Sequence, residues 1–173
     1  MPRRGSTSAL NRLRRGTNPV AIRQTVEDTR LTQSNIDLLR RAWAAYNRGD
    51  EDAFAACLTD DWREYGPDGG SATLEDERPT MALHRLAFPD KQTEFHRIVA
   101  DEDTVACHCT VTATHTGKYL DAEPTGARLV VHEMMFNRVL AGRIAETWAM
   151  TAGPGFYEQI TGREAPEALD NLG

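Results

Sequence analysis

Three pieces of the chain carry the clearest structural pattern: Thr104-Val-Ala-Cys-His-Cys-Thr-Val-Thr-Ala-Thr-His-Thr-Gly117, Arg128-Leu-Val-Val-His-Glu-Met-Met-Phe-Asn-Arg-Val139 and Gly142-Arg-Ile-Ala-Glu-Thr-Trp148. Each piece is rich in β-branched residues and is bounded by Gly, Pro or Asp, which is typical of strands. Together they predict an antiparallel sheet. A sheet with an apolar face needs a covering layer, which helices earlier in the chain can supply.

The first of these helices is predicted to begin at Ser34, whose side chain can cap it with Asp37 three residues on. Apolar residues then recur at spacings of three and four, so they share one face of the helix. Gly49 supplies the stop signal. The apolar stripe consists of Ile36, Leu39, Trp43 and Tyr46.

Two further helices are expected before the sheet. Asp50 caps a short one, and a longer one runs from Pro79, a favourable first helical residue, to Phe88. The buried side of the longer helix is predicted to consist of Met81, Leu83, Leu86 and Ala87.

Strands are predicted after these helices, and a short one at residues 62–65 lies between them. After Gly153-Pro-Gly155 we expect a short irregular tail. The order of elements indicates an α+β fold in which a curved antiparallel sheet wraps around about three helices and leaves an apolar cone, a natural small-molecule pocket. The four later strands are expected at about 93–100, 104–115, 128–140 and 143–151.

The 173 residues suffice for one domain with tails. We expect a basic, mostly flexible arm over residues 1–33, the folded domain over 34–160, and a C-terminal tail over 161–173. No apolar run approaches the roughly 18–20 residues of a membrane span, so we expect no membrane association.

The net charge of −6 is unevenly distributed: residues 1–33 hold seven arginines against Glu27 and Asp28, which leaves −11 on the rest of the chain. An acidic body does not favour nucleic acid, and the arm lacks the interleaved aromatics that stack on bases. We therefore expect no nucleic-acid partner. The alternative for the arm is recruitment of a partner protein or an anionic surface.

The three cysteines, Cys57, Cys107 and Cys109, are interpreted as reduced thiols. Cys107 and Cys109 lie side by side on one face of a predicted strand, which is poor geometry for a mutual disulfide. This usage favours the cytoplasm. His108, between them, points to the opposite face, so one metal ion cannot easily bind all three, and we predict no metal site.

Several short motifs, in this order and spacing, resemble the SnoaL-like polyketide cyclase family, within the nuclear transport factor 2-like superfamily. The resemblance covers about residues 34–160. It implies a cone-shaped pocket, commonly a homodimer, and usually no metal or organic cofactor. The motifs are Ala45-Tyr-Asn-Arg-Gly-Asp50, Leu58-Thr-Asp-Asp-Trp62, Ala87-Phe-Pro-Asp90, Val111-Thr-Ala-Thr-His-Thr-Gly117, Pro124-Thr-Gly126 and Gly142-Arg-Ile-Ala-Glu-Thr-Trp148.

The resemblance also indicates where the family's aldol cyclases carry an acid–base pair, namely an inward His on the penultimate strand and an Asp after the last strand's Trp. The matching positions here are Met135 and Ala149. Neither side chain can carry a proton, so the standard aldol cyclisation is not expected.

Side-chain alternation together with this alignment places the odd-numbered residues of strand 128–140 toward the cone. Glu133 then stands among apolar neighbours, where burial raises the pKa of a carboxyl and suits it to general acid or base chemistry. The alternative is that Glu133 pairs with an arginine such as Arg97 or faces solvent. His115, on the inward phase of strand 104–115, is its candidate partner in proton transfer, or else a structural histidine.

Aromatic and other residues complete the candidate site. Tyr46 and Tyr65 can donate a hydroxyl hydrogen bond to a substrate oxygen, although core packing would explain either equally well. The remaining candidates for substrate contact are Trp43, Trp62, Phe88, His96, Met135 and Trp148.

The function that fits these residues is a cofactor-independent cyclase or isomerase acting on a hydrophobic, natural-product-like intermediate. Glu133 and His115 would transfer protons, Tyr46 would hold a substrate oxygen, and epoxide opening is one reaction that needs only these parts. The alternatives are an epoxide hydrolase of the same fold and a non-catalytic binding or assembly module. An outward-facing Glu133 and a wholly apolar cavity would favour the non-catalytic module.

Overall fold

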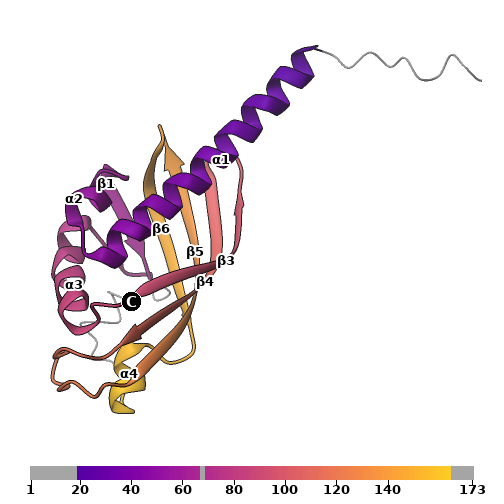
Figure 1. The fold of residues 1–173 in the computed structure, drawn as a ribbon. Coiled ribbons are helices and arrows are strands. Elements are labelled where there is room, and N and C mark those ends of the chain that lie inside the picture. The colour runs from indigo at the N-terminus through magenta and orange to yellow at the C-terminus, as the bar shows by residue number, and fades with distance from the viewer. Residues whose placement is uncertain (1–18, 67–68, 165–173) are drawn as a thin grey trace, which may run out of the picture.

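The computed structural model describes residues 19–66 and 69–164, which form a curved, unclosed sheet covered on its concave side by helices (Figure 1). The sheet has six strands in the order β2-β1-β6-β5-β4-β3. Neighbouring strands are antiparallel except β1 and β6, which pair in parallel. The strands are β1 Leu58–Tyr65, β2 Ser71–Ala72, β3 Gln92–Ala100, β4 Thr104–Thr114, β5 Arg128–Leu140 and β6 Arg143–Ala152.

The four predicted later strands are confirmed to within one residue at each end. The expected short strand at 62–65 begins earlier, at Leu58, and it joins the sheet beside β6 in parallel, so the sheet is not purely antiparallel. Alternation within the strands is also confirmed. The odd-numbered residues from Leu129 to Val139 face the helices, whereas Met134 and Phe136 are exposed on the outer face.

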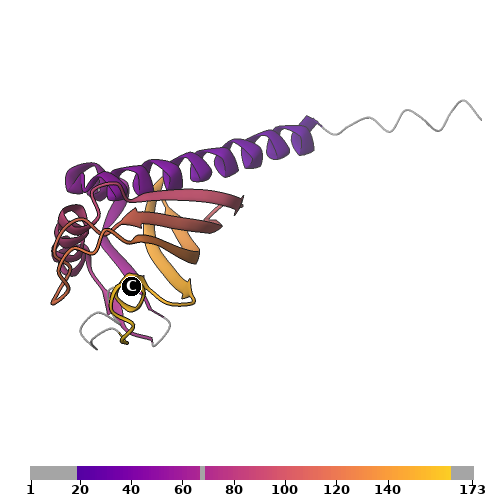
Figure 2. The ribbon, with the colours of Figure 1, turned by 60° about the horizontal axis from the view of Figure 1, so that its bottom comes forward.

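Helix α1 spans Pro19–Arg48 and is longer than predicted. The prediction of a start at Ser34 was wrong, because proline at the first helical position favours the earlier start and Ser34 lies within the helix. Residues 19–33 of the expected flexible arm are therefore helical, while residues 1–18 lie outside the described part. The N-terminal half of α1 projects beyond the body of the protein (Figures 1 and 2).

Helix α2, Glu51–Ala55, confirms the prediction that Asp50 caps a short helix: the Asp50 side chain accepts a hydrogen bond from the Ala53 N–H at 3.2 Å.

Helix α3, Leu74–Ala87, starts five residues before the predicted Pro79. Thr73 and Asp76 form a reciprocal capping box, in which the Thr73 N–H donates to Asp76 at 2.8 Å. Two satisfied backbone donors define the start more strongly than the proline does. The prediction that Leu86 is buried was also wrong, since it is 69% exposed.

Helix α4, Phe156–Thr161, replaces the irregular tail that was predicted after Gly155. It lies at one end of the sheet, away from α1 (Figure 2). The main core lies between α1 and the concave face of β4, β5 and β6, and a second cluster of buried residues around Phe88 and Tyr157 lies near α4. In the described part of the chain, the helices are too short or too polar to cross a membrane.

Candidate active site

Two adjoining chambers lie between the helices and the concave face of the sheet. The first, called here the α4 chamber, has a volume of about 130 Å³ and includes Gly155 and Phe156 in its wall. The second, the glutamate chamber, has a volume of about 60 Å³ and is lined by Glu64, Glu77 and Glu133. Both chambers share Trp43, Tyr46 and Glu133, so these three side chains stand where the chambers meet.

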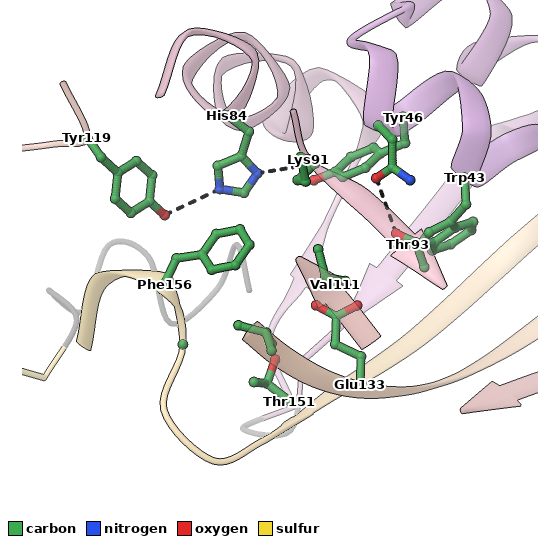
Figure 3. Close-up of a pocket in the computed structure, with 13 residues that line it drawn as sticks. Trp43, Tyr46, His84, Lys91, Thr93, Val111, Tyr119, Glu133, Thr151 and Phe156 are labelled. Atoms are coloured by element: carbon green, nitrogen blue, oxygen red, sulfur yellow. Dashed lines mark hydrogen bonds between the residues drawn. The ribbon is translucent and has the colours of Figure 1, made fainter. Parts of the chain in front are cut away.

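Glu133 lies in the middle of β5, paired with Cys109 of β4 and Thr151 of β6. Its carboxyl group points into the α4 chamber below Lys91 (Figure 3). Burial raises the pKa of Glu133, and the positive charge of Lys91 opposes that rise. The inward placement expected from the sequence is confirmed, while Arg97, the arginine considered as its partner, is exposed on β3.

Lys91 is the cation of the site and is only 7% exposed. Its ammonium lies 4.1 Å from the centre of the Tyr46 ring and 3.4 Å from Nδ1 of His84. Burial lowers the pKa of Lys91 to about 8, against the attraction of Glu133 and Glu77. The group is therefore mostly charged at neutral pH but close to its titration range.

His84 links Lys91 to Tyr119, whose hydroxyl lies 3.3 Å from the His84 Nε2 (Figure 3). An ammonium can only donate, so Nδ1 of His84 accepts and its Nε2–H donates to Tyr119. Burial, together with the charge of Lys91, lowers the pKa of His84 well below its ordinary value. His84 is accordingly a neutral imidazole in one defined tautomer.

The glutamate chamber brings three carboxyl groups together from β1, α3 and β5. Glu77 is 3% exposed, and burial raises its pKa to about 7 even though Lys91 opposes the rise. Burial also raises the pKa of Glu64 well above its ordinary value, with further contributions from the charges of Glu77 and Glu133. No hydrogen bond reaches these three carboxyl groups from residues 27–66 or 69–164.

Of the residues predicted from the sequence, the structure brings Glu133, Tyr46, Trp43 and Met135 together in this cavity. Burial raises the pKa of Tyr46 well above its ordinary value, so its phenol stays protonated and can donate a hydrogen bond. Met135 pairs with Ala149 across β5 and β6, and both line the glutamate chamber. The two positions that the family resemblance matches to the acid–base pair of aldol cyclases therefore face the cavity with no titratable group.

His115 is buried but lines neither chamber. Its ring packs against Phe88 in the second core cluster, with Nδ1 accepting from the Thr125 N–H at 3.3 Å and lying 3.0 Å from the Thr125 hydroxyl. Phe88 is likewise a core residue there. Trp62 is buried in the main core, where its Nε1–H donates to Thr147 at 3.1 Å.

The other predicted residues lie on the outer side of the sheet. Tyr65 stacks on the exposed Trp148 with ring centres 5.1 Å apart. His96 is exposed on β3, with Nε2 2.6 Å from the hydroxyl of Thr110. These three side chains line neither of the two chambers.

Lys91, His84, Glu77 and Glu64 are the site residues that the sequence reasoning missed. Lys91 follows Pro89-Asp90 and resembles an exposed turn residue. Glu77 was missed because α3 was predicted to start two residues after it. The capping pattern Thr73–Asp76 could have placed Glu77 inside the helix, on the same face as the buried Met81 four residues on.

Metal binding is not supported by the described residues, in which no group of three or more His, Cys, Asp or Glu side chains could hold an ion. The curved sheet and its helices enclose a cavity lined by titratable side chains. The chain belongs to the SnoaL-like polyketide cyclase family, whose profile matches residues 36–160.

Solved structures agree with this assignment. AclR from Streptomyces galilaeus, a proposed hydroxylase, is 28% identical with a TM-score of 0.69 and covers 80% of this chain and 88% of its own. IdmH from Streptomyces antibioticus, a proposed polyketide cyclase, is 24% identical with a TM-score of 0.59. The match covers 66% of this chain and 89% of IdmH. A proposed SnoaL-like polyketide cyclase from Jannaschia sp. CCS1 is 16% identical with a TM-score of 0.66. The match covers 78% of this chain and 96% of the Jannaschia protein.

No curated protein shows significant similarity to the chain. Family membership supports a general role as a cyclase or isomerase.

Proposed function

We propose that the protein is a cofactor-independent cyclase that closes a ring in a hydrophobic small-molecule intermediate by acid–base catalysed opening of an epoxide. The observation that carries the proposal is Glu133, a largely buried carboxyl group turned into a cavity of mixed apolar and polar lining and opposed by the buried cation Lys91. A carboxylate in such surroundings is a stronger base than in water.

In the proposed reaction, ionised Glu133 removes the proton from a hydroxyl group of the substrate. The resulting oxygen attacks an epoxide carbon, the carbon–oxygen bond of the epoxide breaks, and the epoxide oxygen takes a proton from an acid in the cavity. Substrate and product are isomers, so neither an oxidant nor a co-substrate is needed. The charge of Lys91 keeps part of Glu133 ionised, and Tyr46 donates a hydrogen bond to a substrate oxygen.

The residues around Glu133 favour epoxide opening over an aldol reaction. Met135 and Ala149 line the chamber at the positions where aldol cyclases of the family carry their acid and base. The inward Glu133 and the charged lining also speak against a purely binding module, for which an outward Glu133 and an apolar lining were expected.

The test uses a phenyl-bearing epoxy alcohol whose hydroxyl can close onto the epoxide to give a five- or six-membered cyclic ether. Liquid chromatography with mass detection separates the cyclic ether, an isomer of the substrate, from the diol, which has gained one water. We expect cyclic ether from the wild type and an about 100-fold slower reaction from Glu133→Gln, the scale of general base catalysis. Glu94→Gln, an exposed outer-face change, is the matched control.

Several outcomes would count against the proposal. Diol as the main product would make the protein an epoxide hydrolase. Equal rates from the wild type and Glu133→Gln would remove Glu133 from the mechanism. A protein that binds the epoxy alcohol without converting it would be the binding module.

We also propose that the protein forms a homodimer through the outer face of its sheet. That face exposes several large apolar side chains, which is unusual for a monomer. Phe136→Arg should convert a dimer into a monomer in light scattering coupled to size exclusion, and a wild-type monomer would refute the idea. The exposed apolar residues of this outer apolar face are Val130, Met134, Phe136, Leu140, Trp148 and Met150.

Finally, we propose a reducing compartment such as the cytoplasm as the place of action. Cys57, Cys107 and Cys109 are all free and buried. Labelling of all three thiols in protein denatured directly from cells, without prior reduction, is the expected result.

A further inference from the structure

The glutamate chamber holds more carboxyl groups than one base requires. Glu64 comes from β1, Glu77 from α3 and Glu133 from β5, and all three line the same space of about 60 Å³. Glu77 is almost fully buried, yet no donor among residues 27–66 and 69–164 satisfies its carboxyl oxygens. Buried polar groups are normally hydrogen-bonded, so this unmet capacity faces the space that a ligand would enter.

One cation cannot balance three carboxylates in this chamber. Lys91 opposes the charges of Glu77 and Glu133, and it does not line the glutamate chamber itself. Carboxylates held close together in a low-dielectric site do not all ionise. Burial raises the pKa of Glu77 and of Glu64, and the charges of Glu77 and Glu133 raise that of Glu64 further. At neutral pH the chamber therefore retains at least one carboxylic acid proton.

We propose that Glu64 and Glu77 form a proton-sharing pair that serves as the acid complementing the base Glu133. This inference rests on the proposed function and supplies the proton that His115 was expected to give. The carboxylic acid of the pair transfers its proton to the epoxide oxygen as the ring carbon–oxygen bond breaks. Glu133 holds the proton taken from the substrate hydroxyl, and solvent exchange returns both carboxyl groups to their starting states.

Other groups in the cavity are poorer acids. Burial raises the pKa of Tyr119 to about 12, and the Nε2–H of the neutral His84 is already donated to Tyr119. The ammonium of Lys91 is the strongest competitor, since its pKa is about 8, but it lies against the Tyr46 ring and His84 in the α4 chamber. Lys91 is therefore included in the experiment as the competing donor.

The experiment measures the pH dependence of ring closure of the epoxy alcohol by the full-length protein and its variants. The wild-type rate should fall at high pH as the acid loses its proton and at low pH as Glu133 gains one. Glu64→Gln and Glu77→Gln should each lower the plateau rate by about 10- to 100-fold and shift or remove the high-pH limb. Glu133→Gln should instead remove the low-pH limb.

The outcomes separate this inference from the proposed function. If Glu64→Gln and Glu77→Gln keep the wild-type high-pH limb, the glutamate pair is not the acid. If Glu133→Gln also removes the low-pH limb, the role of Glu133 as the base is still supported. If Lys91→Met alone removes the high-pH limb, Lys91 is the acid and the pair is refuted. If Glu133→Gln leaves the profile unchanged, the proposed function fails as a whole.

A second measurement needs no substrate and does not depend on whether the variants fold. Protein labelled with ¹³C at the glutamate carboxyl carbon reports each protonation state by its chemical shift. We expect at least one carboxyl signal to remain in the protonated position at about pH 7, well above the ordinary glutamate range near 4.3. Complete ionisation of all glutamates by about pH 6 would overturn the inference.

Discussion

Glu77→Gln is expected to make the protein more stable at neutral pH. The pKa of Glu77 rises from 4.5 to about 7 on folding, because the carboxyl group is almost fully buried. Its proton therefore binds more tightly in the folded state. A group of this kind contributes full stability below about pH 4.5 and loses it as the pH rises through about 7.

The magnitude follows from the same two values. Each tenfold change in proton affinity corresponds to about 1.4 kcal/mol, so ionising Glu77 in the folded protein costs about 3 kcal/mol in all. The protein loses most of this free energy of unfolding as the pH rises from about 4.5 to about 7.5. Glutamine keeps the shape of the protonated acid and cannot ionise. The variant should thus match the wild type near pH 4.5 and exceed its free energy of unfolding by about 3 kcal/mol near pH 7.5.

Urea unfolding followed by tryptophan fluorescence at the two pH values measures the difference. Glu75→Gln is the matched control, because Glu75 lies in the same helix with its side chain 87% exposed. Its effect should stay within about 0.5 kcal/mol and not change with pH. If the difference between Glu77→Gln and the wild type is the same at both pH values, the carboxyl group does not titrate in a buried site and the reasoning is refuted.

Three further predictions follow from the contacts described. Lys91→Met should raise the pKa of Glu133 further, because the opposing positive charge is lost; the low-pH limb of ring closure should move to higher pH, and an unmoved limb would contradict this. Gly117→Ala should destabilise the protein by more than about 1 kcal/mol in urea unfolding, because an added Cβ would meet the Leu86 carbonyl oxygen at 2.1 Å. Leu39→Ala, at a fully buried position, should cost about 2–5 kcal/mol in the same assay, while Leu86→Ala should stay within about 0.5 kcal/mol; equal losses would contradict the core assignment.

The strands and their faces were predictable because alternation is a local signal. The odd-numbered residues of β5 are apolar apart from Glu133 and Asn137, but the even-numbered residues are partly apolar too, so the inward direction of Glu133 followed from alternation only together with the family resemblance. Helix starts were less predictable, since a serine or a proline within a helix imitates a start signal. The predicted start at Pro79 overlooked the cap at Thr73 and so placed Glu77 outside the helix.

The composition of the cavity was only partly predictable because it depends on segments far apart in the sequence. Lys91 lies in a turn whose sequence looks exposed, yet it is buried, with its ammonium against Tyr46 of α1 and His84 of α3. His115 shares the inward phase of Cys109 and Val111, but it follows the last residue of β4, where the chain has moved away from the cavity into the second core. Alternation gives the face of a residue, not its position along the cone.

The attachment of α4 to the sheet has a consequence for how such a cavity can change. The Gln159 side chain donates to the Val130 carbonyl at 2.7 Å and accepts from its N–H at 3.1 Å, and so occupies the place of a longer β6. A β6 extended by two residues would pair with Val130 instead and would displace Gly155 and Phe156 from the wall of the α4 chamber. Insertions or deletions at this one junction would therefore change the size of the α4 chamber, while Glu133, Lys91 and His84, which lie on other segments, stay in place.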